Sequence, residues 1–200
     1  MFNNTTHTDT AMVREVLAGR HDRFAGLVER HWPSVFATAL AHTRNRTDAE
    51  DVVQDTFIQA YTSLDSLRAS GKFGPWVLTI ARNMARSYLR KRSVREEQSA
   101  ETGPGESPET EAQRKEVSAI VSKAVETLPE NEREVILLHY FAGRSAREIG
   151  EALGISRSAV LKRLERGRAR LSEQLLTGHR VDESATTVSE ERVMRGVLAT

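Results

Sequence analysis

Apolar side chains recur at spacings of three and four residues along most of the chain. No segment shows a convincing alternation of apolar and polar residues, which is the pattern of a half-buried strand. Spacings of three and four place apolar side chains on one face of an α-helix, where they can pack against other helices. The sequence therefore predicts an all-α fold.

An acidic stretch divides the chain. Residues 96–112 contain six glutamates, two prolines and two glycines, a composition that buries little apolar surface and predicts a flexible linker. It separates a helical domain over residues 20–95 from a second helical domain over residues 113–176, and we expect it to hold them apart. A tail and leading helix over residues 1–19 precede the first domain, and a tail of unknown role covers residues 177–200.

The charges are nearly balanced, with 29 basic and 28 acidic residues and a net charge of +1. A nucleic-acid function must therefore rest on where the charges lie. Residues 68–95 hold eight basic side chains and no acidic one. The chain has no cysteine, which excludes disulfides, thiolate metal sites and a cysteine nucleophile and favours the cytoplasm. No apolar run approaches the roughly 20 residues that span a bilayer, so we expect no membrane insertion.

Two helices can be located within the first domain. One covers residues 48–61 and is expected to begin with a capping box formed by Thr47 and Glu50. The other begins near Pro75, which fits a first helical turn, and covers residues 76–92. The first of these helices buries one face and exposes another: Ala49, Val52, Val53, Thr56, Phe57 and Ala60 are expected inside, and Glu50, Asp51, Gln54, Asp55 and Gln59 outside.

Phe73 and Trp76 lie within the basic block. Aromatic rings next to arginines suit single-stranded nucleic acid, because the rings stack on unpaired bases and the arginines hold the backbone. The alternative is that both rings belong to the core at the start of the helix, and without other information that alternative is the stronger one.

In the second domain, the sequence predicts helices over residues 113–128 and 130–141. A short helix, capped by Ser145 and ended by Gly154, is expected to follow them. A longer helix, capped by Ser156, follows. The longer helix carries an inner stripe formed by Val160, Leu164, Gly167 and Leu171. A short helix, a glycine turn and a longer helix form a helix-turn-helix. Between positions 157 and 170 the longer helix carries six basic residues against the single acid Glu165, which suits phosphate binding, although a solvated basic face is the alternative.

No catalytic constellation is present. The six histidines show no metal-ligand spacing, and no glycine-rich loop is suited to phosphate. We therefore expect no enzyme activity, no cofactor and no metal site. A recombinase-like enzyme would need a nucleophile or metal-binding carboxylates that the sequence does not show.

Several motifs together resemble the bacterial extracytoplasmic-function (group IV) RNA polymerase sigma factors. The resemblance covers about residues 20–95 and 113–176 and implies a two-domain specificity subunit made of the family's second and fourth regions. The motifs, in chain order, are DAEDVVQDTF at 48–57, WVLTIARN at 76–83, LPENEREVI at 128–136, IGEALGISRSAV at 149–160 and RARL at 168–171.

The resemblance implies three sites. The acidic helix would dock on the clamp helices of the polymerase's largest subunits. The loop over residues 62–73 would capture a base flipped from the promoter's minus-ten element, so that pocket contacts offset the few kcal/mol of unstacking. The residues implied for core polymerase are Asp48, Asp51, Gln54 and Asp55; those for the minus-ten element are Lys72, Phe73, Trp76, Arg82, Asn83, Arg86 and Arg90; those for the minus-thirty-five element are Arg144, Ser156, Arg157, Ser158, Lys162, Arg163 and Arg166.

The implied partners are core RNA polymerase, promoter DNA and a cognate anti-sigma factor. Three positions depart from the family pattern: Leu161 replaces a common lysine, Gly150 a common alanine, and Gly74–Pro75 a charged residue and alanine. A stand-alone helix-turn-helix regulator is the main alternative. Such a regulator needs neither the acidic docking helix nor the aromatic and basic block of the first domain.

Overall fold

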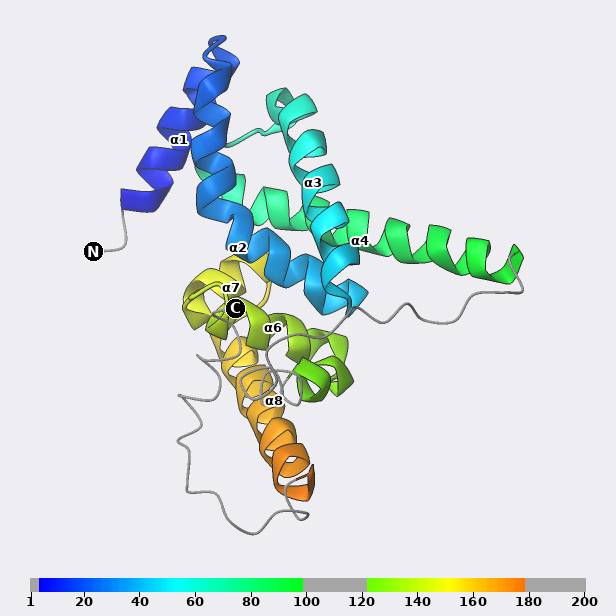
Figure 1. Ribbon diagram of the computed structural model, residues 1–200. Helices are drawn as coiled ribbons and strands as arrows, with labels where there is room; N and C mark the ends of the chain where they lie inside the picture. The colour runs from blue at the N-terminus through cyan, green and yellow to red at the C-terminus, as the bar shows by residue number, and fades with distance from the viewer. Residues whose placement is uncertain (1–3, 99–121, 179–200) are drawn as a thin grey trace, which may run out of the picture.

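The computed structural model describes residues 4–98 and 122–178, and every regular element within them is helical. The predicted all-α class is confirmed for this part of the chain. Figure 1 labels the longer helices. Their bounds are α1 Asn4–Leu17, α2 Phe24–Thr43, α3 Arg46–Thr62, α4 Phe73–Gln98, α6 Glu130–Tyr140, α7 Ala146–Leu153 and α8 Arg157–Gly178, with short 3-10 turns at His21–Arg23, Leu64–Ser66 and Ser70–Lys72 and a helical segment at 122–127.

The first domain is built on α2, α3 and α4, which pack against one another. The six residues predicted for the inner face of α3 are all buried, and the five predicted for its outer face are exposed. α1 is fastened to α2 by the buried Asp9, which lies 2.9 Å from the His31 ring nitrogen and accepts a hydrogen bond from Arg30. The leading helix predicted within residues 1–19 is therefore part of this core.

The predicted start of α3 was two residues late. Asn45 is the N-cap, and its side-chain oxygen accepts a hydrogen bond from the Asp48 backbone N–H at 3.0 Å. Asn and Thr are both good N-cap residues. Because the helix begins directly after Asn45, Thr47 lies inside its first turn and forms no capping box with Glu50.

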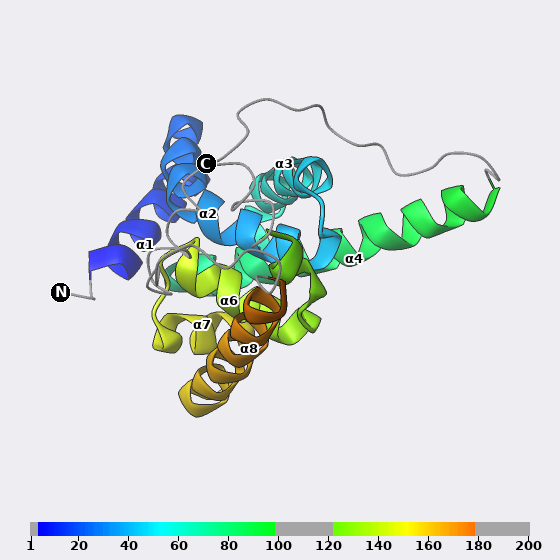
Figure 2. The ribbon, with the colours of Figure 1, turned by 60° about the horizontal axis from the view of Figure 1, so that its bottom comes forward.

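α4 is longer than predicted at both ends, beginning at Phe73 and ending at Gln98. Figures 1 and 2 show its C-terminal half projecting away from the other helices. Residues 96–98 are therefore helical and do not belong to the predicted linker. The rest of that linker and the start of the predicted 113–128 helix lie outside the described residues, as does the tail beyond residue 178.

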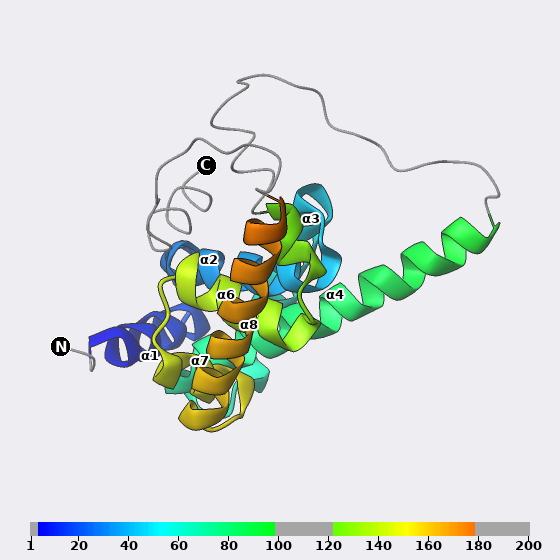
Figure 3. The same cartoon turned by 90° about the horizontal axis from the view of Figure 1, so that it is seen from below.

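The second domain contains the predicted helix-turn-helix. Ser145 and Glu148 form a reciprocal capping box at the start of α7. Gly154 ends α7 in the left-handed conformation at φ 68°, which glycine adopts without steric cost. The Ser156 hydroxyl accepts from the Ala159 backbone N–H at the start of α8. The predicted inner stripe of α8 is buried against α6 and α7, and Figure 3 shows α8 crossing α6 on the outside of the domain.

The two domains are not held apart as the sequence analysis expected. α6 packs against α2 and α7 against α4. The fully buried Arg133 of α6 donates hydrogen bonds to the carbonyls of Ala41, near the C-terminus of α2, and of Leu128. A helix C-terminus carries partial negative charge and unpaired carbonyls, so a guanidinium is well placed there. The Phe36 and Phe141 rings, 5.4 Å apart, add an apolar contact across the same interface.

His42 introduces pH dependence at this interface. Its Nδ1 lies 3.2 Å from a Glu130 carboxylate oxygen of α6, outside hydrogen-bonding geometry. Burial lowers the pKa of His42 below its usual 6.5, Glu134 and Glu130 oppose that effect, and Arg86 and Arg82 support it. The unfolded chain therefore binds a proton more readily than the folded chain as the pH falls through 6.5.

The free energy of unfolding is accordingly expected to fall between pH 7.5 and pH 5.5, with the loss complete below the lowered pKa of His42. Replacing His42 by glutamine, which is neutral throughout, should flatten this part of the pH profile. Urea unfolding at the two pH values measures the difference. Equal pH dependence in the parent chain and in His42→Gln would show that His42 does not contribute.

Candidate nucleic-acid and partner interfaces

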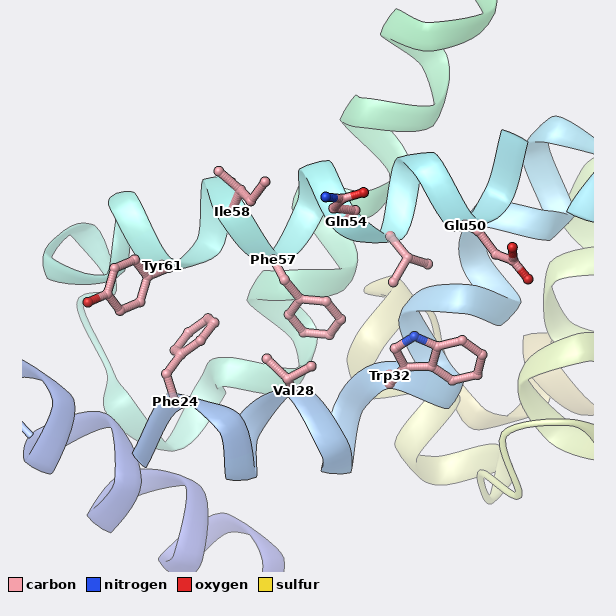
Figure 4. Close-up of a pocket in the computed structure, with 9 residues that line it drawn as sticks. Phe24, Val28, Trp32, Glu50, Gln54, Phe57, Ile58 and Tyr61 are labelled. Carbon is pink, nitrogen blue, oxygen red and sulfur yellow. The ribbon is translucent and has the colours of Figure 1, made fainter. Parts of the chain in front are cut away.

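The outer face of α3 combines acidic residues with an apolar hollow. Asp51, Gln54 and Asp55 are exposed. Beside them, an open hollow of about 500 Å³ lies between α2 and α3, and Figure 4 shows the rings of Phe24 and Phe57 pointing into it. Its other lining residues are Val28, Trp32, Glu50, Val53, Gln54, Ile58 and Tyr61. An apolar centre with a charged rim is the usual composition of a protein–protein interface.

Asp48 differs from its neighbours on α3. Its side chain accepts hydrogen bonds from Tyr88 at 2.8 Å and from Arg92 at 2.5 Å, both on α4. The hydrogen bond to Asp48, together with burial, raises the pKa of Tyr88. Asp48 therefore fastens α3 to α4 and has little carboxylate surface left for a partner.

A second hollow lies at the start of α4, within the loop that was predicted to capture a base. It measures about 480 Å³ and is open to solvent. The half-buried Trp76 and the exposed Lys72 and Arg68 line it. An aromatic ring beside two cations offers stacking and backbone contacts for an unpaired nucleotide. The remaining lining residues are Ser66, Leu67, Ala69, Pro75 and Thr79.

Phe73 is not part of this hollow, and its prediction as a DNA contact is wrong. The side chain is 0% exposed. Its ring packs against His31 at 5.1 Å, Trp76 at 5.8 Å and Phe24 at 6.3 Å between ring centroids. The core alternative therefore holds for Phe73, whereas Trp76 both packs on Phe73 and lines the hollow.

The predicted DNA contacts farther along α4 fall into two groups. Asn83, Arg86 and Arg90 are exposed. Arg82 instead lies between the domains, where it donates to the Glu134 carboxylate at 2.9 Å and to the Ala152 carbonyl at 3.3 Å. In this arrangement Arg82 does not face DNA, contrary to the prediction, because a buried carboxylate on α6 pairs with it.

Arg144 is engaged in the same way. It donates to the Ser34 hydroxyl at 2.8 Å and to the Arg30 carbonyl at 3.3 Å, both on α2. It also lies 3.7 Å from the Glu148 carboxylate. The prediction that Arg144 contacts DNA is therefore not met in this arrangement, since the guanidinium is occupied by the first domain.

The outer face of α8 is open. Arg157, Ser158, Lys162 and Arg166 are exposed, and Arg163 is half-buried. Ser156 serves as the cap described above, and its hydroxyl lies 2.9 Å from that of Ser158. These residues share the N-terminal half of a helix-turn-helix recognition helix, the part that such folds place in the DNA major groove.

Two further residues on this face were absent from the predicted site, namely Leu161 and Glu165. Leu161 is 45% exposed, and Glu165 is exposed as well. The available signals in the sequence were a lone acid among the six basic residues between positions 157 and 170 and a leucine at a position where the family commonly has a lysine.

The structure explains why glycine stands at position 150. A Cβ atom built there would lie 2.8 Å from the Ile155 carbonyl oxygen and 3.6 Å from the Arg157 backbone nitrogen. Those atoms belong to the turn between α7 and α8, so the space for a methyl group is taken by backbone. The close approach of α7 to this turn therefore requires glycine.

Gly150→Ala is expected to destabilise the protein by about 1–3 kcal/mol, the usual effect of overpacking. In an unobstructed helix the same change stabilises by about 0.5–1 kcal/mol, so the sign itself is informative. Gly26→Ala is the matched control, because its nearest neighbour is the flexible end of Met12 at 2.8 Å. Urea unfolding of both variants measures the contrast, and a stabilised Gly150→Ala protein would contradict this account.

Residues 4–98 and 122–178 hold no candidate metal site and no candidate membrane span. No group of three or more histidine, aspartate or glutamate side chains there is placed to hold a metal ion. None of the described helices has both the length and the apolar character that are needed to cross a membrane.

The helix-turn-helix is the fold of a DNA-binding domain, and comparison with known proteins identifies the class of this protein. The Sigma-70 region 2 family matches residues 27–95, and the Sigma-70 region 4 family matches residues 118–171. The first described domain thus corresponds to region 2 and the second to region 4.

Individual relatives agree with these matches. The ECF RNA polymerase sigma factor SigW of Bacillus subtilis is 31% identical over 82% of this chain and 94% of its own length. The probable RNA polymerase sigma factor RfaY of Xanthomonas campestris is 33% identical over 85% of this chain, which spans only 46% of that protein. The structure of CnrH in complex with the cytosolic domain of CnrY matches with a TM-score of 0.62 and 30% identity, covering 85% of this chain and 98% of CnrH.

The chain belongs to the extracytoplasmic-function family of RNA polymerase sigma factors. Members of this family are transcription initiation factors. The resemblance drawn from the sequence motifs is thus confirmed, and the stand-alone regulator is not better supported.

Proposed function

We propose that this chain binds core RNA polymerase, directs it to promoters through minus-ten and minus-thirty-five elements, and promotes DNA opening. It acts in the cytoplasm and performs no catalysis itself, since the polymerase carries out the chemistry. The observation that carries the proposal is the presence, on one chain, of an acidic protein-binding face, a basic hollow beside a tryptophan and an open recognition helix.

The polymerase would dock on α3 through Asp51, Gln54 and Asp55. The neighbouring hollow supports this assignment, because it exposes Ile58 and Tyr61 at 56% and 41% beside the acids. Burying such apolar surface contributes roughly 25 cal/mol per Å², and the acidic rim steers a basic partner toward it. Asp48 supports the surface indirectly by holding α3 against α4.

The minus-ten element would be opened at the hollow lined by Trp76. A flipped base leaves its stack at a cost of a few kcal/mol. Stacking on an aromatic ring returns about 1–3 kcal/mol per base, and Lys72 and Arg68 can hold the adjoining phosphates. Asn83, Arg86 and Arg90, exposed farther along α4, are positioned to follow the backbone on the duplex side.

The minus-thirty-five element would be read by the N-terminal half of α8. Its exposed cations can neutralise phosphates, and each neutralised phosphate releases condensed counterions. Arg82 and Arg144 become available for DNA only when the contacts between the two domains break. An anti-sigma partner fits this picture, since the related CnrH was solved with the cytosolic domain of CnrY. Such a partner would hold the domains in the packed arrangement.

Reconstitution with core polymerase tests the proposal. The full chain should direct initiation at a defined set of start sites that core polymerase alone does not use. A stand-alone regulator would alter the activity of another holoenzyme but create no new start sites with core polymerase. The absence of chain-dependent start sites across the genome of origin would refute the proposed function.

Base-reading and phosphate-binding roles on α8 can be separated with two variants of the holoenzyme. Lys162→Ala should relax preference at one minus-thirty-five position and cost about 1–3 kcal/mol there, whereas Arg168→Ala should weaken all sequences and reduce the salt slope by about one. Selection from randomised minus-thirty-five duplexes at two salt concentrations measures both. Two variants that retained the parent's preference, affinity and salt slope would show that this face is only solvated surface.

A further inference from the structure

The outer face of α8 carries two residues of unexpected chemistry for a DNA-facing helix. Leu161 and Glu165 lie four residues apart, so they share one face of the helix and are separated by about 6 Å along its axis. Both are exposed. The other exposed side chains of this N-terminal half are cations or a serine, namely Arg157, Ser158, Lys162 and Arg166.

Leu161 lies outside the hydrophobic core of the second domain. The core of the second domain is supplied by neighbours on the inner stripe, such as Val160 at 0% and Leu164 at 1% exposure. Leu161 instead leaves 45% of its surface to solvent. In the major groove, the apolar group available to such a side chain is the 5-methyl of thymine. A leucine there gains by desolvating that methyl, whereas it gains nothing from a phosphate.

Glu165 points to base contact by a separate argument. No described cation forms an ion pair with it within 4.0 Å, although several lie on the same helix. A carboxylate close to DNA is repelled by the phosphates, so its presence lowers non-specific affinity. It becomes favourable where it accepts a hydrogen bond from an exocyclic amino group, and the common acceptor pairing for a glutamate is with cytosine N4.

We propose that Leu161 and Glu165 are specificity-determining residues of the recognition helix. Leu161 contacts the methyl group of a thymine, and Glu165 accepts a hydrogen bond from the N4 amino group of a cytosine one or two base pairs away. The separation is limited to this range because about 6 Å along the helix spans less than two base-pair steps of 3.4 Å. The inference rests on the proposed function, since it requires α8 to lie in the major groove.

The test for Leu161 uses the holoenzyme and the element it selects from randomised minus-thirty-five duplexes. Each selected thymine is replaced by deoxyuridine, which removes only the methyl group. At one position the parent holoenzyme should bind the uracil duplex roughly threefold to fivefold more weakly, the effect of one buried methyl. Leu161→Ala should bind the two duplexes equally. Leu17→Ala, at an exposed leucine on α1, should retain the parent's sensitivity.

The test for Glu165 compares Glu165→Ala with Glu29→Ala, an exposed glutamate on α2. Glu165→Ala should lose roughly fivefold or more of its preference for cytosine at one position. It should also bind unrelated DNA more tightly, because a charge that repels phosphates has been removed. If Glu165 had a purely structural role, neither the cytosine preference nor the affinity for unrelated DNA would change in this way. Glu29→Ala should leave both quantities unchanged.

The outcomes separate the two levels of the argument. If the parent holoenzyme selects no sequence at all, both the proposed function and this inference fail. If it selects an element but neither deoxyuridine nor the two variants alter the preference, the function stands and the inference is overturned. A selected element without a thymine at the position sensitive to Leu161→Ala would overturn it as well.

Discussion

Phe73→Ala is expected to lower the free energy of unfolding by about 3–5 kcal/mol, the usual range for removing a fully buried phenylalanine. The ring is completely enclosed where α2 and α4 meet, and it contacts His31, Phe24 and Trp76. Few alternative rotamers could fill the cavity, since those three neighbours are aromatic. Urea unfolding of the full chain measures the effect.

Trp76→Ala is the matched comparison, because Trp76 packs on Phe73 but also lines the open hollow. With the holoenzyme, Phe73→Ala should slow open-complex formation equally on an intact duplex and on a template already mismatched across the minus-ten region. Trp76→Ala should slow it more on the intact duplex, where the base must still be unstacked. If Phe73→Ala slowed opening more on the intact duplex than on the mismatched template, a direct role of Phe73 in DNA opening would be indicated.

The positions of α3, α6, α7 and the start of α8 followed largely from the sequence because local rules determine them, whereas α2 was not located. Periodicity located the buried face of α3, and Ser145, Gly154 and Ser156 marked the ends of α7 and the start of α8. Each of these signals depends on residues within one or two helical turns. The start of α3 was predicted wrongly because two nearby residues, Asn45 and Thr47, can both act as the N-cap, and only the backbone geometry decides between them.

The roles of the arginines did not follow from the sequence. A guanidinium pairs equally well with a phosphate, a carboxylate or a helix C-terminus. Arg82 donates a hydrogen bond to Glu134, 52 residues away in the sequence, and Arg144 donates one to Ser34, 110 residues away. No local pattern reports such partners. The packing of the two domains was partly hidden for this reason, because two of the residues that join them, Arg82 and Arg144, were predicted to contact DNA.

Reversing Asp51 and Asp55 to lysine is expected to weaken binding to core polymerase at least about tenfold, because like charges brought together at an interface cost several kcal/mol. Both carboxylates are exposed on α3, so the fold should be unaffected. Asp48 is left intact, since it holds Tyr88 and Arg92. The matched control reverses Glu29 and Glu151, two exposed acids away from α3, with the same change in net charge. A titration of labelled chain with core polymerase at two salt concentrations measures the affinities. Equal affinity of the two double variants would show that general charge, and not the α3 face, governs docking. A loss of affinity that is confined to Asp51→Lys/Asp55→Lys, and that becomes smaller at higher salt, assigns the polymerase to this face.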